Sequence, residues 1–457
     1  MLFLTTQKNK MKRKLNTIIV AGLLASFLYT INSQAQEKNS ISISSKEIIK
    51  VDANQYYKEP FRPQFHFSPE KKWMNDPNGM LFHNGTYHLF YQYYPEDIVW
   101  GPMHWGHATS TDLIHWQHKK IALFPDELGY IFSGSAVMDV NNTSGLGTKE
   151  NPPMIAVYTY HNMEFEKAGK INTQTQGLAY SLDEGETWTK YQANPIINNI
   201  TLKDFRDPKV FWNNDTKLWT LVLVAGDRAQ FYTSKNLINW NLESEFGQNR
   251  GAHGGVWECP DLFKLKINGT QEEKWVLLVS INPGAPNGGS ATQYFVGDFD
   301  GKTFTTSQKE TKWIDYGTDN YAGVTYNDAP GGERIFIGWM SNWNYARDTP
   351  TTNWRSAMTL PRTLSLSTIK GDYVLQSQPV AQFDKQLSTD FSIEKIKLNK
   401  GVDKAFAYSN INQSKIQFKA ENKNLKLVFS NDVNDLLVLQ YDAQKQTFAI
   451  DRRLSGK

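Results

Sequence analysis

The sequence contains a single cysteine, Cys259, among 457 residues, and this scarcity excludes two ways of stabilising a chain. One thiol cannot form an internal disulfide. The nine histidines show no metal-ligand spacing with one another or with Cys259. We therefore expect no disulfide and no bound metal, and no sequence motif implies a cofactor.

Long apolar runs are also scarce, and no helical pattern of useful length is present. The one apolar stretch, Thr17 to Ile31, is too short to be a good membrane span. Basic residues at 12–14 precede it and the small-x-small triplet at 33–35 follows it, as in a signal peptide. We expect residues 1–35 to be a signal peptide that exports the chain to the periplasm or the medium, and residues 36–60 to be a linker.

An excess of basic charge is missing as well. The whole chain has 49 basic and 46 acidic residues, a net charge of +3. Five of the basic residues and none of the acidic ones precede residue 36, which leaves 49 − 5 − 46 = −2. A nearly neutral chain without a basic stripe gives no reason to propose a nucleic-acid partner and suits a neutral ligand such as a sugar. The sequence does not indicate an oligomeric state.

Aromatic residues, by contrast, are abundant at 13%, and the chain is long enough for two domains. One unit recurs five times: an apolar strand, a polar turn and a second apolar strand, with the period-2 alternation of antiparallel sheets. The five turns are His83-Asn84-Gly85, Asn141-Asn142-Thr143, Asn213-Asn214-Asp215, Asn268-Gly269-Thr270 and Asn327-Asp328-Ala329.

Units of roughly 50 to 70 residues are each too small to bury their own faces, which favours a radially repeated architecture. The sequence therefore predicts an all-β fold, with a five-bladed β-propeller over residues 61–380. Beyond Pro379 the pattern changes to shorter alternating strands rich in Lys, Asn and Ser. Residues 381–457 are accordingly predicted to form a separate β domain.

Three short acidic motifs stand far apart along the chain: Trp73 to Gly79, Phe205 to Pro208 and Trp257 to Asp261. Each sets a carboxylate among aromatic, Pro and Gly residues, where turn chemistry holds the acid beside apolar surface. The innermost strands of a propeller converge on its axis. Asp76, Asp207 and Glu258 can therefore meet in one axial pocket, although 131 and 51 positions separate them.

These motifs resemble the three signatures of glycoside hydrolase family 32, which contains invertases, inulinases and levanases. The segments at 103–107, 132–135 and 354–362 fit the same family, in the family's order. The resemblance runs from about residue 60 to 380 and implies a five-bladed propeller followed by a C-terminal β-sandwich. Residues 381–457 are expected to be the start of that sandwich, and they are too few to complete one, which suggests a truncated chain.

The resemblance also implies a role for each acid. Cleavage of a ketosidic bond needs an anion beneath the anomeric carbon and a proton donor for the leaving oxygen. Asp76 is expected to be the nucleophile, forming a covalent fructosyl-enzyme intermediate with retention of configuration. Glu258 is expected to be the general acid and base. Asp207 is expected to stabilise the transition state through sugar hydroxyls.

Around these acids, the resemblance places a substrate-binding wall for a terminal fructose, formed by Asn75, Gln92, Trp100, Phe132, Ser133, Arg206 and Trp339. Several of these residues have an alternative, purely structural role. Gln92 could be a strand residue that faces solvent, Phe132 ordinary core, and Trp339 part of the propeller core. For Cys259 we favour a buried thiol in a packed turn over a catalytic role.

The sequence thus predicts an exported glycosidase that releases terminal β-D-fructose from levan or inulin, and from sucrose. An endo-acting fructanase and a fructosyltransferase would use the same acids. Another five-bladed glycosidase family, acting on arabinose or xylose polymers, also uses three acids, but its motifs differ from these. A non-catalytic carbohydrate-binding propeller would be expected to have lost at least one acid. The preference for β-2,1 or β-2,6 linkages is left open.

Overall fold

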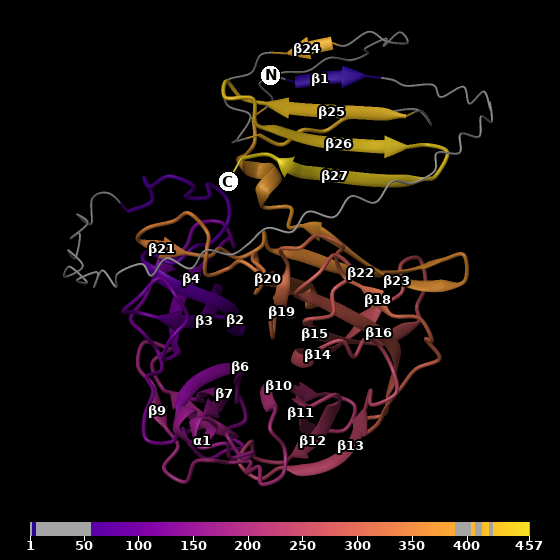
Figure 1. The fold of residues 1–457 in the computed structure, drawn as a ribbon. Coiled ribbons are helices and arrows are strands. Elements are labelled where there is room, and N and C mark those ends of the chain that lie inside the picture. Colours follow the sequence, from indigo (N-terminus) through magenta and orange to yellow (C-terminus); the bar gives the residue numbers. More distant parts are fainter. Residues whose placement is uncertain (1, 6–55, 389–403, 407–413, 420–423, 457) are drawn as a thin grey trace, which may run out of the picture. The chain divides into compact units, whose positions relative to one another are not determined.

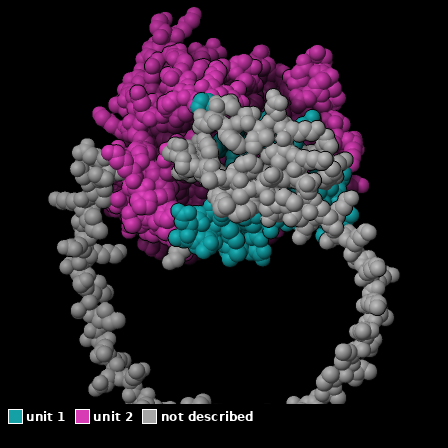
Figure 2. All heavy atoms as spheres, turned by 90° about the horizontal axis from the view of Figure 1, so that it is seen from above, with its two compact units in different colours: residues 1–51, 388–457 teal, residues 52–387 magenta. Residues whose placement is uncertain are grey.

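The computed structural model describes residues 2–5, 56–388, 404–406, 414–419 and 424–456, and its described elements are almost entirely β-strands (Figure 1). The chain divides into two compact units, which Figure 2 shows in separate colours. Unit 1 comprises residues 1–51 and 388–457, and unit 2 comprises residues 52–387.

Unit 2 consists of five mainly antiparallel sheets that succeed one another along the chain (Figure 1). The strands of blade 1, in sheet order, are β21 (Trp354–Arg355), β2 (Lys72–His83), β3 (Thr86–Tyr94), β4 (His104–Ser110) and β5 (Gln117–His118). Blade 2 contains β6 (Tyr130–Met138), β7 (Met154–His161), β8 (Gln174–Ser181) and β9 (Thr189–Lys190). Blade 3 contains β10 (Phe205–Asn213), β11 (Leu218–Ala225), β12 (Ala229–Ser234) and β13 (Asn241–Phe246).

The last two blades follow the same plan. Blade 4 contains β14 (Val256–Lys266), β15 (Glu273–Asn282), β16 (Ala291–Phe299) and β17 (Phe304–Thr305), with β18 (Lys312–Trp313) also paired to β16. Blade 5 contains β19 (Tyr321–Thr325), β20 (Arg334–Trp339), β22 (Arg362–Ile369) and β23 (Asp372–Pro379). The described helices are short: α1 (Met163–Lys167), η2 (Pro330–Gly332) and η3 (Phe383–Gln386).

The five sheets close into a ring. Each innermost strand, in the order β2, β6, β10, β14 and β19, contacts the next, and β19 contacts β2 again. β21, from near the end of unit 2, pairs in parallel with β2 and joins the first blade to the last part of the ring. Apolar clusters fill the space between neighbouring sheets, as where Val157 of blade 2 packs in one cluster with Leu221 of blade 3. The predicted five-bladed propeller is confirmed.

Asn327, which follows β19, ties blade 5 to three other blades near the axis. Its backbone N–H donates to the Met80 carbonyl, 3.0 Å away, and its own carbonyl accepts from Phe82 N, also at 3.0 Å. Its side-chain amide donates to the carbonyls of Ala136 at 2.8 Å and Val210 at 3.0 Å. Because Asn327 is only 6% exposed, water cannot readily replace these bonds.

The described part of unit 1 is one antiparallel sheet. Its strands, in sheet order, are β24 (Lys404–Phe406), β1 (Leu2–Thr5), β25 (Leu425–Ser430), β26 (Leu436–Asp442) and β27 (Thr447–Leu454). This sheet agrees with the predicted C-terminal β domain. β1 belongs to the segment predicted as a signal peptide, whereas the apolar run of that segment lies outside the described residues. Among the described helices, none has the length and apolar character needed to cross a membrane.

Replacing Asn327 by alanine should lower the free energy of unfolding by about 2 to 3 kcal/mol, because two hydrogen bonds are lost and two buried carbonyls remain unpaired. Urea denaturation followed by tryptophan fluorescence measures the change. Asn214→Ala, at an exposed turn in blade 3, is the matched control and should change stability little. Equal, small effects in both variants would contradict the role of Asn327 in closing the ring.

Candidate active site

All five innermost strands carry a β-bulge near their start. In each bulge, two residues of the innermost strand face a single residue of the second strand of the blade. In blade 1, for example, Asn75 and Asp76 both face Gln92. The regular pairs on either side of this bulge are Met74–Tyr93 and Pro77–Tyr91. The other four bulges are Phe132-Ser133, Asp207-Pro208, Cys259-Pro260 and Ala322-Gly323. A bulge bends the strand and redirects its side chains, so five equivalent points of the ring present side chains out of the regular alternation.

The bulges place the three predicted acids together. Asp76 and Asp207 lie within bulges, and Glu258 is the last paired residue before one. Arg206, Glu258 and Tyr321 occupy the same position in three successive blades, which explains why residues 52 and 63 positions apart contact each other. Backbone strain accompanies this arrangement, because Asp207 has a φ of 64° and Cys259 a φ of 44°.

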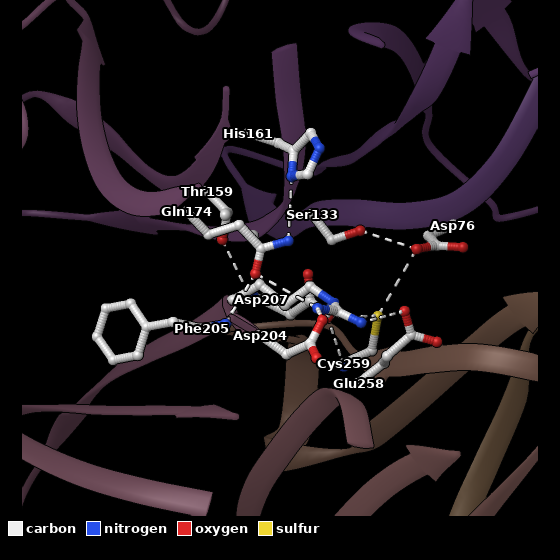
Figure 3. Close-up of polar contacts among 12 residues, drawn as sticks. Asp76, Ser133, Thr159, His161, Gln174, Asp204, Phe205, Asp207, Glu258 and Cys259 are labelled. Atoms are coloured by element: carbon white, nitrogen blue, oxygen red, sulfur yellow. Dashed lines mark hydrogen bonds and ion pairs between the residues drawn. The ribbon is translucent and has the colours of Figure 1, made fainter. Parts of the chain in front are cut away.

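Asp76 accepts hydrogen bonds on both carboxylate oxygens. Asn75 Nδ2 donates to Oδ1 at 3.0 Å. Ser133 Oγ donates to Oδ2 at 2.9 Å, as Figure 3 shows. Trp73 Nε1 in turn donates to Asn75 Oδ1 at 2.8 Å, which fixes the orientation of that amide. Burial nevertheless dominates and raises the pKa of Asp76 to about 6, with a further contribution from the charge of Asp207.

Glu258 is held from both sides. Arg206 Nη2 donates to its Oε1 at 3.0 Å, and the hydroxyl of Tyr321 donates to its Oε2. Burial raises the pKa of Glu258 to about 7; the Arg206 guanidinium lowers it, and the carboxylates of Asp207 and Asp76 raise it further. Burial thus favours the protonated form of Glu258, which is the form that a proton donor needs.

Asp207 receives backbone support. Its own N–H donates to Thr159 Oγ1 at 2.9 Å, and Cys259 N donates to its Oδ2 at 2.9 Å. Burial raises the pKa of Asp207, while the adjacent Arg206 lowers it. Arg206 also contacts Asp204 Oδ1 at 2.6 Å. One buried guanidinium thus offsets the charge of several acids, and they keep its pKa above the usual value.

The predicted wall residues divide into three groups. Asn75 and Ser133 contact Asp76, and Arg206 contacts Glu258. Trp100 and Phe132 are half-buried and meet edge to face, with ring centroids 6.1 Å apart. Gln92 and Trp339 lie deeper.

Gln92 does not face solvent, the alternative considered from the sequence. It is buried and donates to the Ile131 carbonyl at 3.0 Å, next to the bulge of β6. Trp339 is fully buried and packs against Tyr321 and Trp343, so its ring supports the wall from behind rather than presenting a free face.

Sequence reasoning missed two groups at the site. Tyr321 belongs to none of the acidic motifs, yet its hydroxyl contacts Glu258. The Cys259 thiol is buried, as expected, but its Sγ lies 3.7 Å from Asp76 Oδ2 and 3.6 Å from Asp207 Oδ2. These carboxylates and burial raise the pKa of Cys259 well above its usual value, so the thiol stays protonated and donates to the acids.

A cavity of about 710 Å³ lies further along the inner strands, lined by Lys209, Asp261, Asn327 and Arg334 among others. None of the three acids lines it. Lys209 Nζ pairs there with Asp261 Oδ2 at 3.4 Å, so these charges largely neutralise each other. We place the chemistry at the acids instead, because three carboxyls whose pKa values are raised by burial meet there, whereas Asp328, whose pKa is also raised, lines the cavity away from them.

A sequence profile described as the glycosyl hydrolases family 32 N-terminal domain matches residues 66–379. The chain belongs to glycosyl hydrolase family 32. The matched range contains all three acids, all five bulges and every predicted wall residue. The family resemblance seen in the sequence is therefore confirmed.

Relatives of this family 32 chain include a levanase of Bacillus subtilis, 54% identical over 334 residues, which are 72% of this chain and 48% of the levanase. An extracellular exo-inulinase of Aspergillus niger is 42% identical over 434 residues, covering 88% of this chain and 81% of the relative. The chain thus spans about half the length of the levanase and most of the length of the inulinase.

Solved family 32 structures share the fold. An exo-inulinase from Aspergillus awamori aligns with a TM-score of 0.74 and 39% identity over 88% of this chain and 84% of the other. A fructofuranosidase from Schwanniomyces occidentalis, complexed with fructose, aligns with a TM-score of 0.76 and 34% identity over 90% and 83% of the two chains.

The raised pKa of Glu258 makes a prediction about stability that does not depend on activity. Folding raises the pKa of Glu258 from 4.5 to about 7. Its carboxyl therefore stabilises the fold fully below pH 4.5, and this contribution to stability is lost as the pH rises to about 7 and above. Glu258→Gln should therefore melt a few degrees above wild type at pH 8, and the difference should shrink towards pH 5.

Calorimetry at both pH values measures this effect. Glu310→Gln, at an exposed position in unit 2, provides the control and should change the melting temperature little at either pH. A Glu258→Gln variant that is less stable than wild type at pH 8 would show that the contacts of Glu258 outweigh the burial of its charge.

Proposed function

We propose that this protein is a retaining glycosidase that releases terminal β-D-fructose from fructans and from sucrose. The observation that carries the proposal is the meeting of Asp76, Asp207 and Glu258 at the bulges of the inner strands. Asn75 and Ser133 hold Asp76, whereas Arg206 and Tyr321 hold Glu258. Two carboxyls in such different settings allow one to act as a nucleophile while the other donates a proton. The names of the relatives, levanase and exo-inulinase, support the substrate class.

In the first step, an oxygen of the Asp76 carboxylate attacks the anomeric C2 of the terminal fructose. The bond from C2 to the bridging oxygen breaks, and Glu258 gives its proton to that oxygen, so that a covalent fructosyl-enzyme ester forms. Asn75 and Ser133 hold the attacking carboxylate by the hydrogen bonds described above. The thiol of Cys259 adds a weaker contact.

In the second step, water attacks C2 and gives a proton to the ionised Glu258. The ester bond to Asp76 breaks, and fructose leaves with its original configuration. Asp207 accepts hydrogen bonds from sugar hydroxyls, and its charge favours the oxocarbenium-like transition state. The Arg206 guanidinium lowers the pKa of Asp207, against the effect of burial, and so favours the ionised form of that carboxyl.

A neutral sugar suits this site because its half-buried wall is aromatic. Trp100 and Phe132 are half-buried and contact each other, and Phe132 directly precedes Ser133, which donates to Asp76. Sugars present both C–H faces and hydroxyls, so rings and polar groups together can bind them. An endo-acting fructanase or a fructosyltransferase would use the same three acids. A non-catalytic binding propeller is less favoured, because all three acids are present and hydrogen-bonded.

We also propose that the chain is exported, through the predicted signal peptide at residues 1–35. The extracellular exo-inulinase of Aspergillus niger supports this location. A periplasmic or extracellular enzyme would meet polymeric fructans directly. This setting agrees with the absence of any cysteine other than Cys259, since the fold then does not depend on the redox state of its surroundings.

The proposal is tested by following the products from levan, inulin and sucrose, with Asp76→Asn as the matched inactive variant. We expect free fructose from the start, and a fall in kcat of at least about a thousandfold in the variant, because the amide cannot form the ester. Circular dichroism checks that the variant is folded. Near-normal turnover by Asp76→Asn would rule out the nucleophile, and early release of oligosaccharides would indicate endo cleavage.

Glu258→Gln should affect substrates according to their leaving groups. Sucrose and fructans need protonation of the leaving oxygen, so their kcat should fall by about a hundredfold or more, whereas an aryl fructoside with an acidic phenol should lose much less in the first step. Burst kinetics with the aryl substrate separates that step from hydrolysis of the intermediate. Equal losses on both substrates would argue against the acid role.

A further inference from the structure

Two cross-strand pairs of polar residues on β7 and β8 of blade 2 contact the start of β10 in blade 3, and Figure 3 labels Thr159, His161 and Gln174 among them. Thr159 lies opposite Gln176, and His161 lies opposite Gln174. Because alternate residues of a strand share a face, both pairs lie on the same face of the sheet. All four side chains are buried, so each of their polar groups needs a partner within the protein.

The pair of Thr159 and Gln176 holds the backbone on either side of Arg206. Gln176 Nε2 donates to the Phe205 carbonyl at 2.8 Å, and Asp207 N donates to Thr159 Oγ1 at 2.9 Å. The threonine hydroxyl then donates to Gln176 Oε1 at 2.7 Å. The backbone of the Asp207 bulge is therefore fixed from the neighbouring blade.

The pair of His161 and Gln174 holds the Arg206 side chain. Gln174 Oε1 accepts from Phe205 N at 2.7 Å and from Arg206 Nη1 at 3.3 Å. A backbone N–H can only donate, so the amide oxygen must lie on this side and Nε2 must face His161. Gln174 Nε2 lies 3.2 Å from His161 Nδ1.

This geometry decides the tautomer of His161. Its Nδ1 must accept from Gln174, so the proton lies on Nε2, which donates to Glu166 Oε2 at 2.8 Å. The charged groups that face the ring are Glu166 from α1, and Asp204 and Arg206 from the segment that opens blade 3. Burial lowers the pKa of His161, which agrees with a neutral ring.

We propose that His161 and Gln174 are positioning residues for Glu258: the neutral His161 ring anchors the Gln174 amide, and Gln174 holds the Arg206 guanidinium against the Glu258 carboxyl. The inference rests on the proposed function, in which Glu258 is the general acid. It gives blade 2 a part in proton transfer at blade 4, through the chain of contacts from His161 to Gln174, Arg206 and Glu258.

Loss of the acceptor at His161 has a definite consequence. Gln174 Nε2 becomes an unpaired buried donor, so the side chain turns to another acceptor and releases Arg206. Asp204, whose Oδ1 lies 2.6 Å from Arg206 Nη1, then draws the guanidinium away from Glu258. The charge of Arg206 lowers the pKa of Glu258, so its withdrawal must raise that pKa.

His161→Asn and His161→Leu form a matched pair of variants with nearly the same shape. Both remove the ring that stacks on Phe132, with centroids 4.4 Å apart, but only asparagine places an acceptor oxygen near the former Nδ1. In His161→Leu we expect kcat on sucrose to fall about tenfold at pH 6. The basic limb of the kcat/KM profile should move up by about half a pH unit.

His161→Asn should keep the wild-type profile and at least a third of the wild-type kcat. Equal effects in the two variants, with an unmoved basic limb, would overturn the proposal and assign the loss to the Phe132 stack. Circular dichroism checks folding, and Gln174→Met replaces His161→Leu if the latter does not fold. For Gln174→Met we expect the same upward shift of the basic limb of the kcat/KM profile. A basic limb that did not move in this variant would again overturn the proposal.

Crystal structures of the two His161 variants test this proposal independently of the proposed function. If His161→Leu does not fold, the structure of Gln174→Met takes its place. If the wild type released no fructose, the proposed function would fail, while the position of Arg206 would still be measurable. We expect the distance from Arg206 Nη2 to Glu258 Oε1 to stay near 3.0 Å in His161→Asn and to lengthen in the variant without the acceptor. An unchanged distance in that variant would overturn the positioning role.

Discussion

The hydrogen bond from the Arg206 guanidinium to the Glu258 carboxyl is the contact on which the rest of this site depends. Three carboxyls meet at the axis, and burial raises the pKa of each of them. The charge of Asp207 raises the pKa values of Asp76 and Glu258 further. One guanidinium, hydrogen-bonded to Asp204 and Glu258 and adjacent to Asp207, keeps this cluster from protonating completely. Its charge lowers the pKa values of Asp207 and Glu258 and so opposes the effect of burial on both carboxyls.

The fold creates that cluster by repeating one irregularity around the ring. A regular strand would point consecutive side chains to opposite faces, whereas the extra residue of a bulge turns them toward the axis. Asp76 with Ser133, and Asp207 with Cys259, are neighbours because they occupy matching bulge positions in adjacent blades. The same repeat explains the row formed by Arg206, Glu258 and Tyr321.

Buried charge at the axis costs stability, and other parts of unit 2 compensate for it. Asn327 joins four blades through backbone and side-chain hydrogen bonds, and apolar clusters fill the gaps between the sheets. The polar pairs Thr159–Gln176 and His161–Gln174 of β7 and β8 satisfy one another's buried donors and acceptors. They also hydrogen-bond to the backbone at the start of β10 and so hold that strand in place. A site that carries destabilising carboxylates within an otherwise well-packed propeller is the usual compromise between stability and function.

The sequence by itself determined the β-propeller, the family and the three acids, because turn residues, strand alternation and motifs are local patterns. It also pointed to Asn75, Ser133 and Arg206, which lie next to those acids or within the matching motifs. Only the tertiary structure decided that Tyr321, Gln174 and the Cys259 thiol join the site and that Trp339 lies behind it. Their contacts span blades and depend on bulge register, and a shift of one residue in a strand sends a side chain to the opposite face.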